Sequence, residues 1–403
     1  MQLCLAGKVK SVNAPQPSNS PRFGFLDALR GLAILGVVST HCAWFAGGDF
    51  RGRPFAFAGL YGVQLFFMVS AFTIFLTLER ALARERVPVA GFYIRRLLRI
   101  VPMFWVGILL YAFAPGREHY YTNSDLGASY YALTAMLQHG WHPYYINTVV
   151  PGGWSIAVEA TFYIFAPLLF FRVQNWRRAV YLLLGSLLLY GAANNFLRIA
   201  TDHQWVFTNI EPHELLTQFS NKWFPSQLPV FACGILTFYL LKAMPEGFHT
   251  RRNGLLLLCA ALMLLYNAVD IGSHRLLPEQ VVFALGFLPL MLAVAIHPFP
   301  LVVNPAVCFL GRISYSFYLM HFVVMDAEVR WCHRLLPGLF THPALAYLAL
   351  FALTLVLATP VAWTTYRFVE QPFIRLGSGI VRRLNAAPEK TPKAAAVLTP
   401  TDS

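Results

Sequence analysis

Charged side chains are scarce in this sequence. Asp, Glu, Lys and Arg make up 12% of its 403 residues, whereas hydrophobic residues make up 57% and aromatic residues 15%. A soluble fold of this length has too little interior to bury so much apolar surface. The scarcity of charge therefore excludes a soluble protein and predicts one that is surrounded by lipid.

Two further sequence features are missing. The six cysteines show no Cys-x-x-Cys spacing, and four of them lie in apolar blocks, where cysteine behaves as a small hydrophobic residue. We therefore predict neither a disulfide framework nor a metal site. The polar residues 1–22 lack the apolar core of a secretory signal, so the first apolar span is expected to remain in the mature protein.

Apolar residues occur in blocks of about 17–22, the length at which a helix crosses about 30 Å of hydrocarbon. This pattern predicts an all-α polytopic membrane protein with about ten transmembrane helices. The predicted spans are 25–44, 57–78, 99–114, 154–171, 179–197, 226–243, 254–270, 280–297, 306–325 and 343–366.

Basic residues follow the second, fourth and sixth of these spans, and the positive-inside rule puts those connections in the cytoplasm. An even number of spans then places both termini there. Membrane orientation explains the net charge of +13 better than nucleic-acid binding does. The expected divisions are a polar cytoplasmic N-terminus (1–24), a membrane domain (25–375) and a basic, disordered cytoplasmic tail (376–403).

The longest loop on the outer side, residues 115–153, is rich in aromatic residues. Its rings could hold a sugar against their faces, or they could anchor the chain at the membrane interface, and both interpretations remain open. The tyrosines concerned are Tyr120, Tyr121, Tyr130, Tyr131, Tyr144 and Tyr145.

The first predicted span carries Arg30 and His41, and ionisable side chains at membrane depth are candidates for function. Eleven residues separate them, so at about 100° per residue they share nearly one face, with a rise of about 16 Å between them. Coenzyme A would fit, with its phosphates at Arg30 and its arm reaching His41, where an imidazole is a natural general base. Alternatively, His41 hydrogen-bonds between helices and Arg30 reaches lipid phosphate.

The fourth span opens with Trp154 and Ser155 and carries Glu159 about one turn later. A buried carboxylate needs a partner, and an imidazole or a guanidinium would serve. If the partner is His41, the carboxylate orients that ring and stabilises its imidazolium form. A structural contact with a tyrosine or an arginine is the alternative.

The ninth span carries Ser314, Tyr318 and His321 at intervals of three to four residues, which predicts that they line one helix face. His321 is then a second imidazole near mid-membrane. It could take part in catalysis or form an interhelical hydrogen bond.

Three arginines, Arg95, Arg96 and Arg99, precede Pro102 at the start of the third span. Clustered guanidinium groups can bind nucleotide phosphates through forked hydrogen bonds. The membrane topology alone would also demand basic residues at this position. Both interpretations remain open.

Six motifs, in this order, resemble those of the membrane acyltransferase 3 family. They are FLDALRGLA (25–33) leading to His41, FFMVS (66–70), YIRRLLRIVP (93–102), GWSIAVE (153–159), LGRISYSFYLMH (310–321) and EQPF (370–373). The second motif departs from the family, because Ala71 stands where glycine is expected after Ser70. Helix contact should survive there, whereas a backbone role of that glycine is in doubt.

The resemblance implies a ten-helix domain that takes an acyl group, usually acetyl, from acyl-coenzyme A. Family members O-acylate lipopolysaccharide, exopolysaccharide, nodulation factors, peptidoglycan or macrolide antibiotics. The expected acceptor here is an extracytoplasmic or lipid-linked glycan. The expected location is the bacterial inner membrane, where polysaccharide-synthesis proteins could be partners.

The resemblance also assigns roles to the candidate residues. His41, Glu159 and His321 are the expected catalytic residues. The residues expected to bind acyl-coenzyme A or the acceptor are Arg30, Arg95, Arg96, Arg99, Trp154, Ser155 and Tyr318. A membrane exporter is the alternative function, and a non-catalytic partner in a polysaccharide-synthesis complex is a third.

Overall fold

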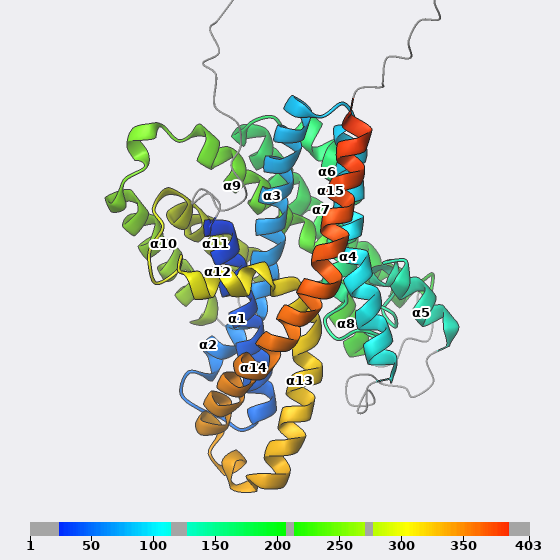
Figure 1. Cartoon of the computed structure of the whole chain (residues 1–403), viewed down its shortest axis with the longest axis vertical. Coiled ribbons are helices and arrows are strands. Elements are labelled where there is room, and N and C mark those ends of the chain that lie inside the picture. The colour runs from blue at the N-terminus through cyan, green and yellow to red at the C-terminus, as the bar shows by residue number, and fades with distance from the viewer. Residues whose placement is uncertain (1–23, 114–126, 207–212, 271–276, 387–403) are drawn as a thin grey trace, which may run out of the picture.

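The structure is a computed structural model that describes residues 24–113, 127–206, 213–270 and 277–386 (Figure 1). These residues form helices and turns, with no strand among them. Nine helices in the described part are long and apolar enough to cross a membrane, and counting one bent pair as a span gives ten. The prediction of an all-α polytopic membrane protein is confirmed.

Single short helices separate groups of long helices along the chain. The long ones are α1 (Gly24–Ala46), α3 (Gly62–Arg84), α4 (Pro88–Phe113), α6 (Trp154–Arg172), α7 (Trp176–Asp202), α9 (Phe224–Ala243), α10 (Arg251–Asp270), α11 (Glu279–Ile296), α13 (Ser314–Leu335), α14 (Pro343–Thr365) and α15 (Gln371–Asn385). The short ones include α2 (Arg53–Ala58), α5 (Ala128–Ala135), α8 (His213–Lys222) and α12 (Pro305–Arg312).

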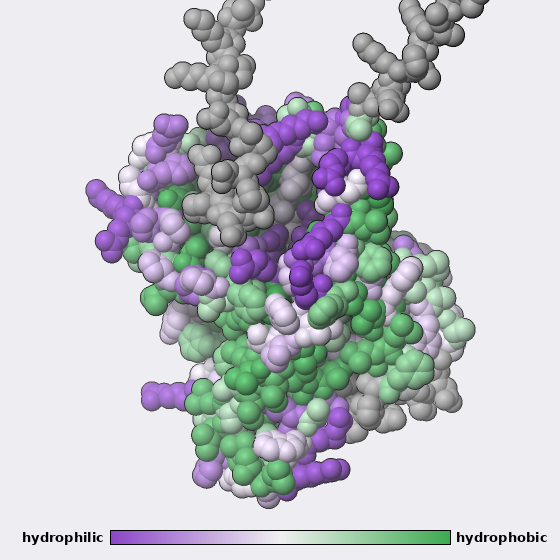
Figure 2. All heavy atoms as spheres, viewed as in Figure 1, coloured by the Kyte–Doolittle hydropathy of each residue, from purple (hydrophilic) through white to green (hydrophobic). Residues whose placement is uncertain are grey.

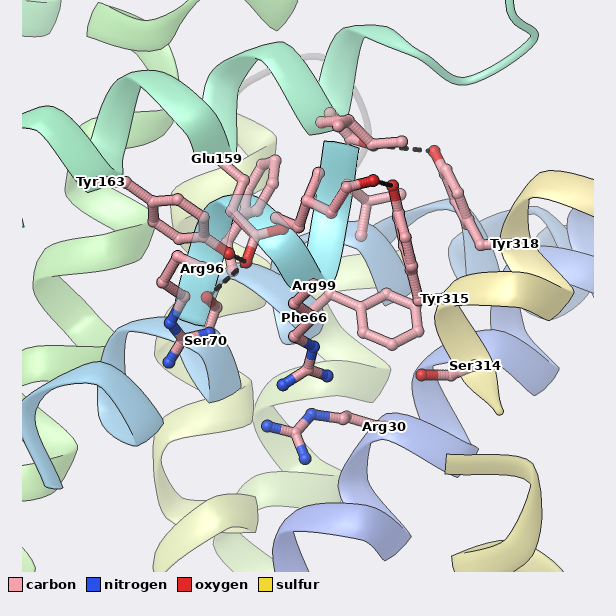
Figure 3. A pocket seen from close by; sticks show the side chains of 15 residues that line it. Arg30, Phe66, Ser70, Arg96, Arg99, Glu159, Tyr163, Ser314, Tyr315 and Tyr318 are labelled. Atoms are coloured by element: carbon pink, nitrogen blue, oxygen red, sulfur yellow. Dashed lines mark hydrogen bonds between the residues drawn. The ribbon is translucent and has the colours of Figure 1, made fainter. Parts of the chain in front are cut away.

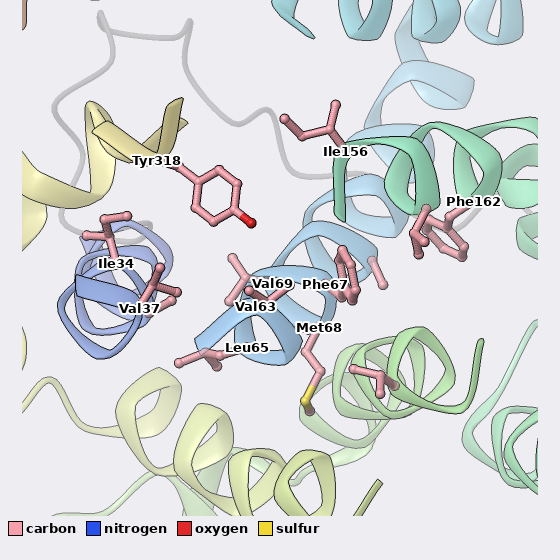
Figure 4. Packing of buried hydrophobic residues seen from close by; sticks show 14 of the residues in the cluster. Ile34, Val37, Val63, Leu65, Phe67, Met68, Val69, Ile156, Phe162 and Tyr318 are labelled. Carbon is pink, nitrogen blue, oxygen red and sulfur yellow. The ribbon is translucent and has the colours of Figure 1, made fainter. Parts of the chain in front are cut away.

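Helix α3 lies at the centre of the bundle. Its apolar side chains pack against α1, α6 and α9 (Figure 4). Phe67 shows how closely, since its ring stacks on Phe231 of α9 at 4.7 Å and meets Trp154 of α6 edge to face at 6.0 Å. Dense packing of this kind is a main stabilising term for helices in lipid, where water does not drive them together.

Helices α1 and α12 cross with their backbones in contact. An added Cβ atom at Gly311 would lie 1.7 Å from the Asp27 carbonyl oxygen, and one at Gly31 would lie 2.2 Å from the Val307 carbonyl oxygen. Only glycine permits so close an approach. The crossing fixes the N-terminal part of α1, which carries Arg30.

The prediction of a continuous ninth helix over 306–325 is wrong. The chain bends by 81° between α12 and α13, so that α12 (yellow in Figure 1) runs across the view while α13 descends from its end. Helix α13 then continues to Leu335, through residues that we expected to form a loop. The apolar pattern does not reveal the bend, because the residues on both sides of it are apolar. The direction of α12 depends on its glycine contacts with α1, which hydropathy does not record.

Two other predicted boundaries need correction. Helix α4 begins at Pro88, so the arginine cluster lies inside the helix, where three charges had masked its apolar pattern. Helix α15 extends to Asn385 and packs on α4, so residues 376–385 are not a disordered tail. Residues 1–23 and 387–403 lie outside the described residues, as do Tyr120 and Tyr121.

Large apolar side chains cover the outside of the bundle. Figure 2 shows them over the middle of one face, with polar residues gathered toward both ends. Phe113 is 85% exposed and Leu188 is 77% exposed, which would be unfavourable in water. This surface is suited to contact with lipid tails, as expected for a multi-pass membrane protein.

Candidate functional site

Three adjoining cavities within the bundle are lined by the predicted site residues, except for the fully buried His321. The arginine cavity, of about 190 Å³, is lined by α3, α4 and α15. It shares Arg96 and Arg99 with the central cavity of about 80 Å³. The central cavity shares Val63 and Tyr318 with the amide cavity of about 880 Å³, which is named for its six Gln and Asn side chains.

Two of the predicted arginines are held in ion pairs. Arg95 binds Glu85 through two hydrogen bonds of 2.9 and 3.1 Å, a forked arrangement that fixes its guanidinium at the wall of the arginine cavity. Arg30 donates to Asp27 at 3.2 Å and to the Thr73 hydroxyl at 3.0 Å. Asp27 and Thr73 thus hold Arg30 at the central cavity.

Arg96 and Arg99 form no ion pair with any residue in the described ranges. The Arg96 guanidinium lies over the Tyr163 ring at 5.4 Å. In Figure 3 the guanidinium groups of Arg30 and Arg99 face each other across the central cavity, near enough to repel. Two like charges held together in this way attract an anion between them.

Glu159 lies among these arginines and not beside His41. Its carboxylate accepts hydrogen bonds from Ser70 at 2.5 Å and from Tyr163 at 2.7 Å (Figure 3). Arg96 and Arg99 are close enough to interact with it electrostatically. The structure therefore pairs Glu159 with hydroxyl and guanidinium groups, which is the second of the two interpretations left open by the sequence, a contact with a tyrosine or an arginine. The first interpretation, that Glu159 orients the His41 ring, does not hold.

Trp154, Ser155 and Tyr318 form the wall between the central and amide cavities. The Tyr318 hydroxyl donates to the Gly152 carbonyl at 3.0 Å, and the Ser155 hydroxyl lies 3.0 Å from the Tyr318 oxygen. Gly152 has φ +74° and leaves no room for a Cβ atom, which would lie 2.6 Å from that tyrosine oxygen. The glycine thus sets the position of Tyr318.

His41 and His321 meet across the interface of α1 and α13. Nδ1 of His41 lies 3.3 Å from Nε2 of His321, and both rings contact Phe322. His321 is fully buried, whereas His41 lines the amide cavity. Arg30 lines the central cavity and His41 lines the amide cavity, and these two cavities share Val63 and Tyr318. The two side chains therefore point to the same side of α1, as their spacing predicts.

The hydrogen bonds determine which ring nitrogens carry hydrogen when both imidazoles are neutral. Nδ1 of His321 lies 2.8 Å from the Tyr318 carbonyl oxygen, which only accepts, so that nitrogen carries the hydrogen. Its Nε2 is then an acceptor, and the His41 Nδ1 must donate to it. Nε2 of His41 is therefore left with a lone pair, as a general base requires.

Several residues at or next to these cavities did not appear among the predicted site residues. Ser70 and Glu370 lay within quoted motifs, and Glu370 accepts from Ser316 at 2.9 Å close to Arg99. Lys222 and the amide side chains gave no signal, because they lie at span ends, where polar residues are common. The aromatic loop reaches the amide cavity through Asn147, Pro151 and Gly152, whereas none of its four described tyrosines lines the three cavities. The rings of Tyr130 and Tyr145 instead pack edge to face on each other at 4.4 Å.

The five described cysteines are free, and Cys4 lies outside the described residues. Ala71, the departure from the second motif, packs where a Cβ atom on Gly234 would be 3.0 Å away. The small side chain thus preserves the contact between α3 and α9. We find no cluster of three His, Cys, Asp or Glu side chains suited to a metal in the described part.

Comparison with known proteins gave one family match. The model of the acyltransferase domain of the acyltransferase 3 family matches residues 23–366. That range includes all three cavities except the α15 wall of the arginine cavity. No solved structure matched.

Curated proteins are also similar to this chain. Two from Staphylococcus aureus strains COL and MSSA476, both provisionally named O-acetyltransferases, are 24% identical over 402 residues, covering 91% of this chain and 59% of theirs. Nodulation protein 10 of Rhizobium leguminosarum bv. viciae is 24% identical over 406 residues, covering 92% of this chain and 100% of its own. The chain thus spans 59% of the length of the staphylococcal relatives.

Proposed function

Because the chain belongs to the acyltransferase 3 family, we propose that it is a multi-pass membrane enzyme that transfers an acyl group to a hydroxyl oxygen. The proposed donor is acyl-coenzyme A, in particular acetyl-coenzyme A, and the proposed acceptor is an extracytoplasmic or lipid-linked glycan. The proposed location is a bacterial inner membrane. The observation that carries the proposal is the His41–His321 pair at a junction between a cationic and a polar cavity.

The donor's phosphates would bind at the arginine cavity. Arg96 and Arg99 form no ion pair there with a described residue, and the hydroxyls of Thr73, Thr77 and Ser378 line the same space. A nucleotide phosphate offers the oxygen atoms that forked guanidinium groups bind. The thioester arm would then pass Arg30 and Tyr318 toward His41.

In the proposed reaction, Nε2 of His41 takes the proton of the acceptor hydroxyl as its oxygen attacks the thioester carbonyl carbon. A carbon–oxygen bond forms, and the carbon–sulfur bond breaks. The proton on His41 then passes to the departing sulfur, which leaves as the coenzyme A thiol. His321 holds the His41 ring in the tautomer that this step needs.

The acceptor would enter through the amide cavity. Six amide side chains line it together with the rings of Trp44, Trp154 and Tyr190. Amides pair with hydroxyl groups, and indole faces pack on the apolar faces of sugar rings. The provisional O-acetyltransferase names of the staphylococcal relatives agree with acyl transfer to oxygen.

The first experiment is transfer of labelled acetyl from acetyl-coenzyme A to envelope polysaccharide by membranes that contain the wild-type protein or His41→Ala at matched levels. We expect label that requires the protein and falls by at least about 10²-fold in His41→Ala. Equal labelling by both would exclude His41 as the base. Absence of protein-dependent label with every acyl donor tried would overturn the proposal and favour transport.

A further inference from the structure

Lys222, at the end of α8, places an unpaired positive charge in the wall of the amide cavity. No residue in the described ranges gives it a hydrogen bond or an ion pair. Its side chain is largely enclosed by protein, and its charge reaches the His41 ring. An enclosed ammonium without a counter-charge is unfavourable, because burial removes the water that solvates it, so a ligand that supplies the counter-charge is expected.

The acidic residue of the same cavity does not neutralise this lysine. Glu279 also lines the amide cavity, and its carboxylate accepts a hydrogen bond from the Tyr61 hydroxyl. It forms no ion pair with Lys222. The two charges therefore remain separate features of the wall, and Lys222 is left for a ligand.

Two buried amide oxygens in the same wall receive no hydrogen bond from any described residue. Gln64 is 5% exposed, and its amide nitrogen donates to Gln227 at 3.1 Å, yet its Oε1 has no partner in the described ranges. The same holds for Oδ1 of Asn147. Buried acceptors rarely stay unsatisfied, because burial deprives them of hydrogen bonds to water, and hydroxyl groups of a ligand would satisfy both.

The Gln64 amide is held in place for such a ligand. Its partner Gln227 donates in turn to the backbone carbonyl of Asn221 at 2.7 Å, next to Lys222 in the chain. The chain of hydrogen bonds links α3, α9 and the end of α8. The unpaired oxygen and the unpaired ammonium thus belong to one connected wall.

We propose that the acceptor bound in the amide cavity is an anionic saccharide, whose carboxylate or phosphate pairs with Lys222 while its hydroxyls donate to Gln64 and Asn147. The cavity, at about 880 Å³, has the size of a site for a small ligand. The acceptor identity rests on the proposed function, whereas the binding of an anionic saccharide can be measured without any transfer.

A different role for Lys222 must be distinguished from this one. An ammonium near His41 could stabilise the oxyanion that forms on the thioester carbonyl. Loss of that role would slow transfer to neutral and anionic acceptors alike. Loss of anion recognition instead weakens the binding of anionic saccharides only.

The experiment measures dissociation constants by saturation-transfer NMR with the full chain in lipid nanodiscs. One arm compares tri-galacturonate with its full methyl ester, which keeps the skeleton and removes the charge. A second arm compares mannose 6-phosphate with mannose, so that carboxylate and phosphate are tested separately. The variants are Lys222→Gln, Lys222→Arg and a control, Lys242→Gln, whose lysine pairs with Glu79 outside the cavity.

We expect at least one anionic probe to bind about tenfold more tightly than its neutral partner. Lys222→Gln should abolish this preference, whereas Lys222→Arg and Lys242→Gln should retain it. The arm that shows the preference identifies the anion as carboxylate or phosphate. If Lys222→Gln does not fold, the wild-type comparison of each anionic probe with its neutral partner still tests the proposal.

Equal binding of charged and neutral probes by the wild type would overturn the inference, as would a preference that survives Lys222→Gln. If Lys222→Gln leaves the binding of anionic saccharides unchanged but slows acyl transfer to every acceptor, Lys222 would be assigned to stabilisation of the oxyanion instead. Lys222-dependent binding without any protein-dependent acyl transfer would overturn the proposed function and leave the saccharide site standing.

Discussion

The His41 and His321 side chains form a pair whose hydrogen bonds run in one direction, from His41 through His321 to the Tyr318 carbonyl. That direction decides which His41 nitrogen can accept a proton. In water the two neutral tautomers of an imidazole interchange freely. Here the backbone of α13 selects one of them, so we propose that His321 acts through His41 as a positioning residue.

Replacement of His321 tests this role. His321→Leu removes the acceptor for the His41 Nδ1 hydrogen, so we expect kcat to fall by about 10²-fold with little change in KM for the donor. His321→Gln can offer a carbonyl oxygen in its place and should recover part of the rate. The measurement is the pH profile of kcat for all three proteins. Equal losses in both variants, with an unchanged profile, would contradict it.

His139 supplies a pH-dependent contribution to stability from outside the spans. It is 2% exposed, and Nε2 bonds to the Gly153 carbonyl at 3.0 Å. Burial lowers the pKa of its imidazole from 6.5 to about 4, although the Gly153 carbonyl acts in the opposite sense. At a pH between these two pKa values, the unfolded chain binds more protons at this site than the folded chain does. The free energy of unfolding therefore falls by about 3 kcal/mol as the pH is lowered through this range, and it keeps its full value above pH 6.5.

Thermal unfolding in detergent at about pH 7.5 and about pH 5 measures this effect. We expect the wild type to lose more stability on acidification than His139→Gln, because glutamine does not titrate. His203→Gln is the control, since that ring is exposed. An identical pH response in wild type and His139→Gln would exclude His139 as its source.

Sequence reasoning at this scale succeeded where a helix repeat relates residues to one another. Arg30 and His41 were placed on one face of α1 from their spacing alone. For Glu159 the sequence left two kinds of partner open, and the choice of a tyrosine over His41 depends on how α3, α4 and α6 pack. Lys222 was missed for a similar reason, since only the fold shows that its charge lies in a cavity wall.

At the scale of helices, the break between α12 and α13 shapes the site. It brings Ser314, at the start of α13, to the central cavity with Tyr315 and Tyr318. A straight helix over 306–325 would run past this region. The tight contact of Gly311 with Asp27 holds α12 against α1 and so fixes where α13 begins.

Gly311→Ala should disrupt this crossing. The new methyl carbon would lie 1.7 Å from the Asp27 carbonyl oxygen, so α1 and α12 must separate, at a cost of about 3 kcal/mol or more. Gly185→Ala in α7 is the matched control, because nothing lies within 4 Å of its added methyl group. The measurement is the yield of monodisperse protein and its unfolding temperature. Equal yield and unfolding temperature for both variants would contradict the crossing.

Most helices were predictable because lipid demands long apolar stretches, which stand out in the sequence. The exceptions have specific causes. Helix α4 begins at Pro88 and not at residue 99, because the protein interior accommodates the arginines that interrupt its apolar pattern. The bend at α12 arose from a backbone contact that no hydropathy pattern records.

For the whole molecule, the positive-inside rule predicts that the connection after α3 faces the cytoplasm and the one after α1 faces outward. Asp49→Cys and Arg86→Cys lie at exposed positions in these two connections. In a cysteine-free background, a membrane-impermeant maleimide should label Asp49→Cys in intact cells and Arg86→Cys only after permeabilisation. The reverse pattern would invert the orientation.

The central cavity, of about 80 Å³, also bears on the electrical insulation of the membrane. It has the smallest volume of the three adjoining cavities, and the guanidinium groups of Arg30 and Arg99 face each other inside it. Fixed positive charge at a constriction excludes cations and protons, as it does in water channels. An enzyme built this way could pass an acyl arm through its bundle while the proton gradient of the cell stays intact.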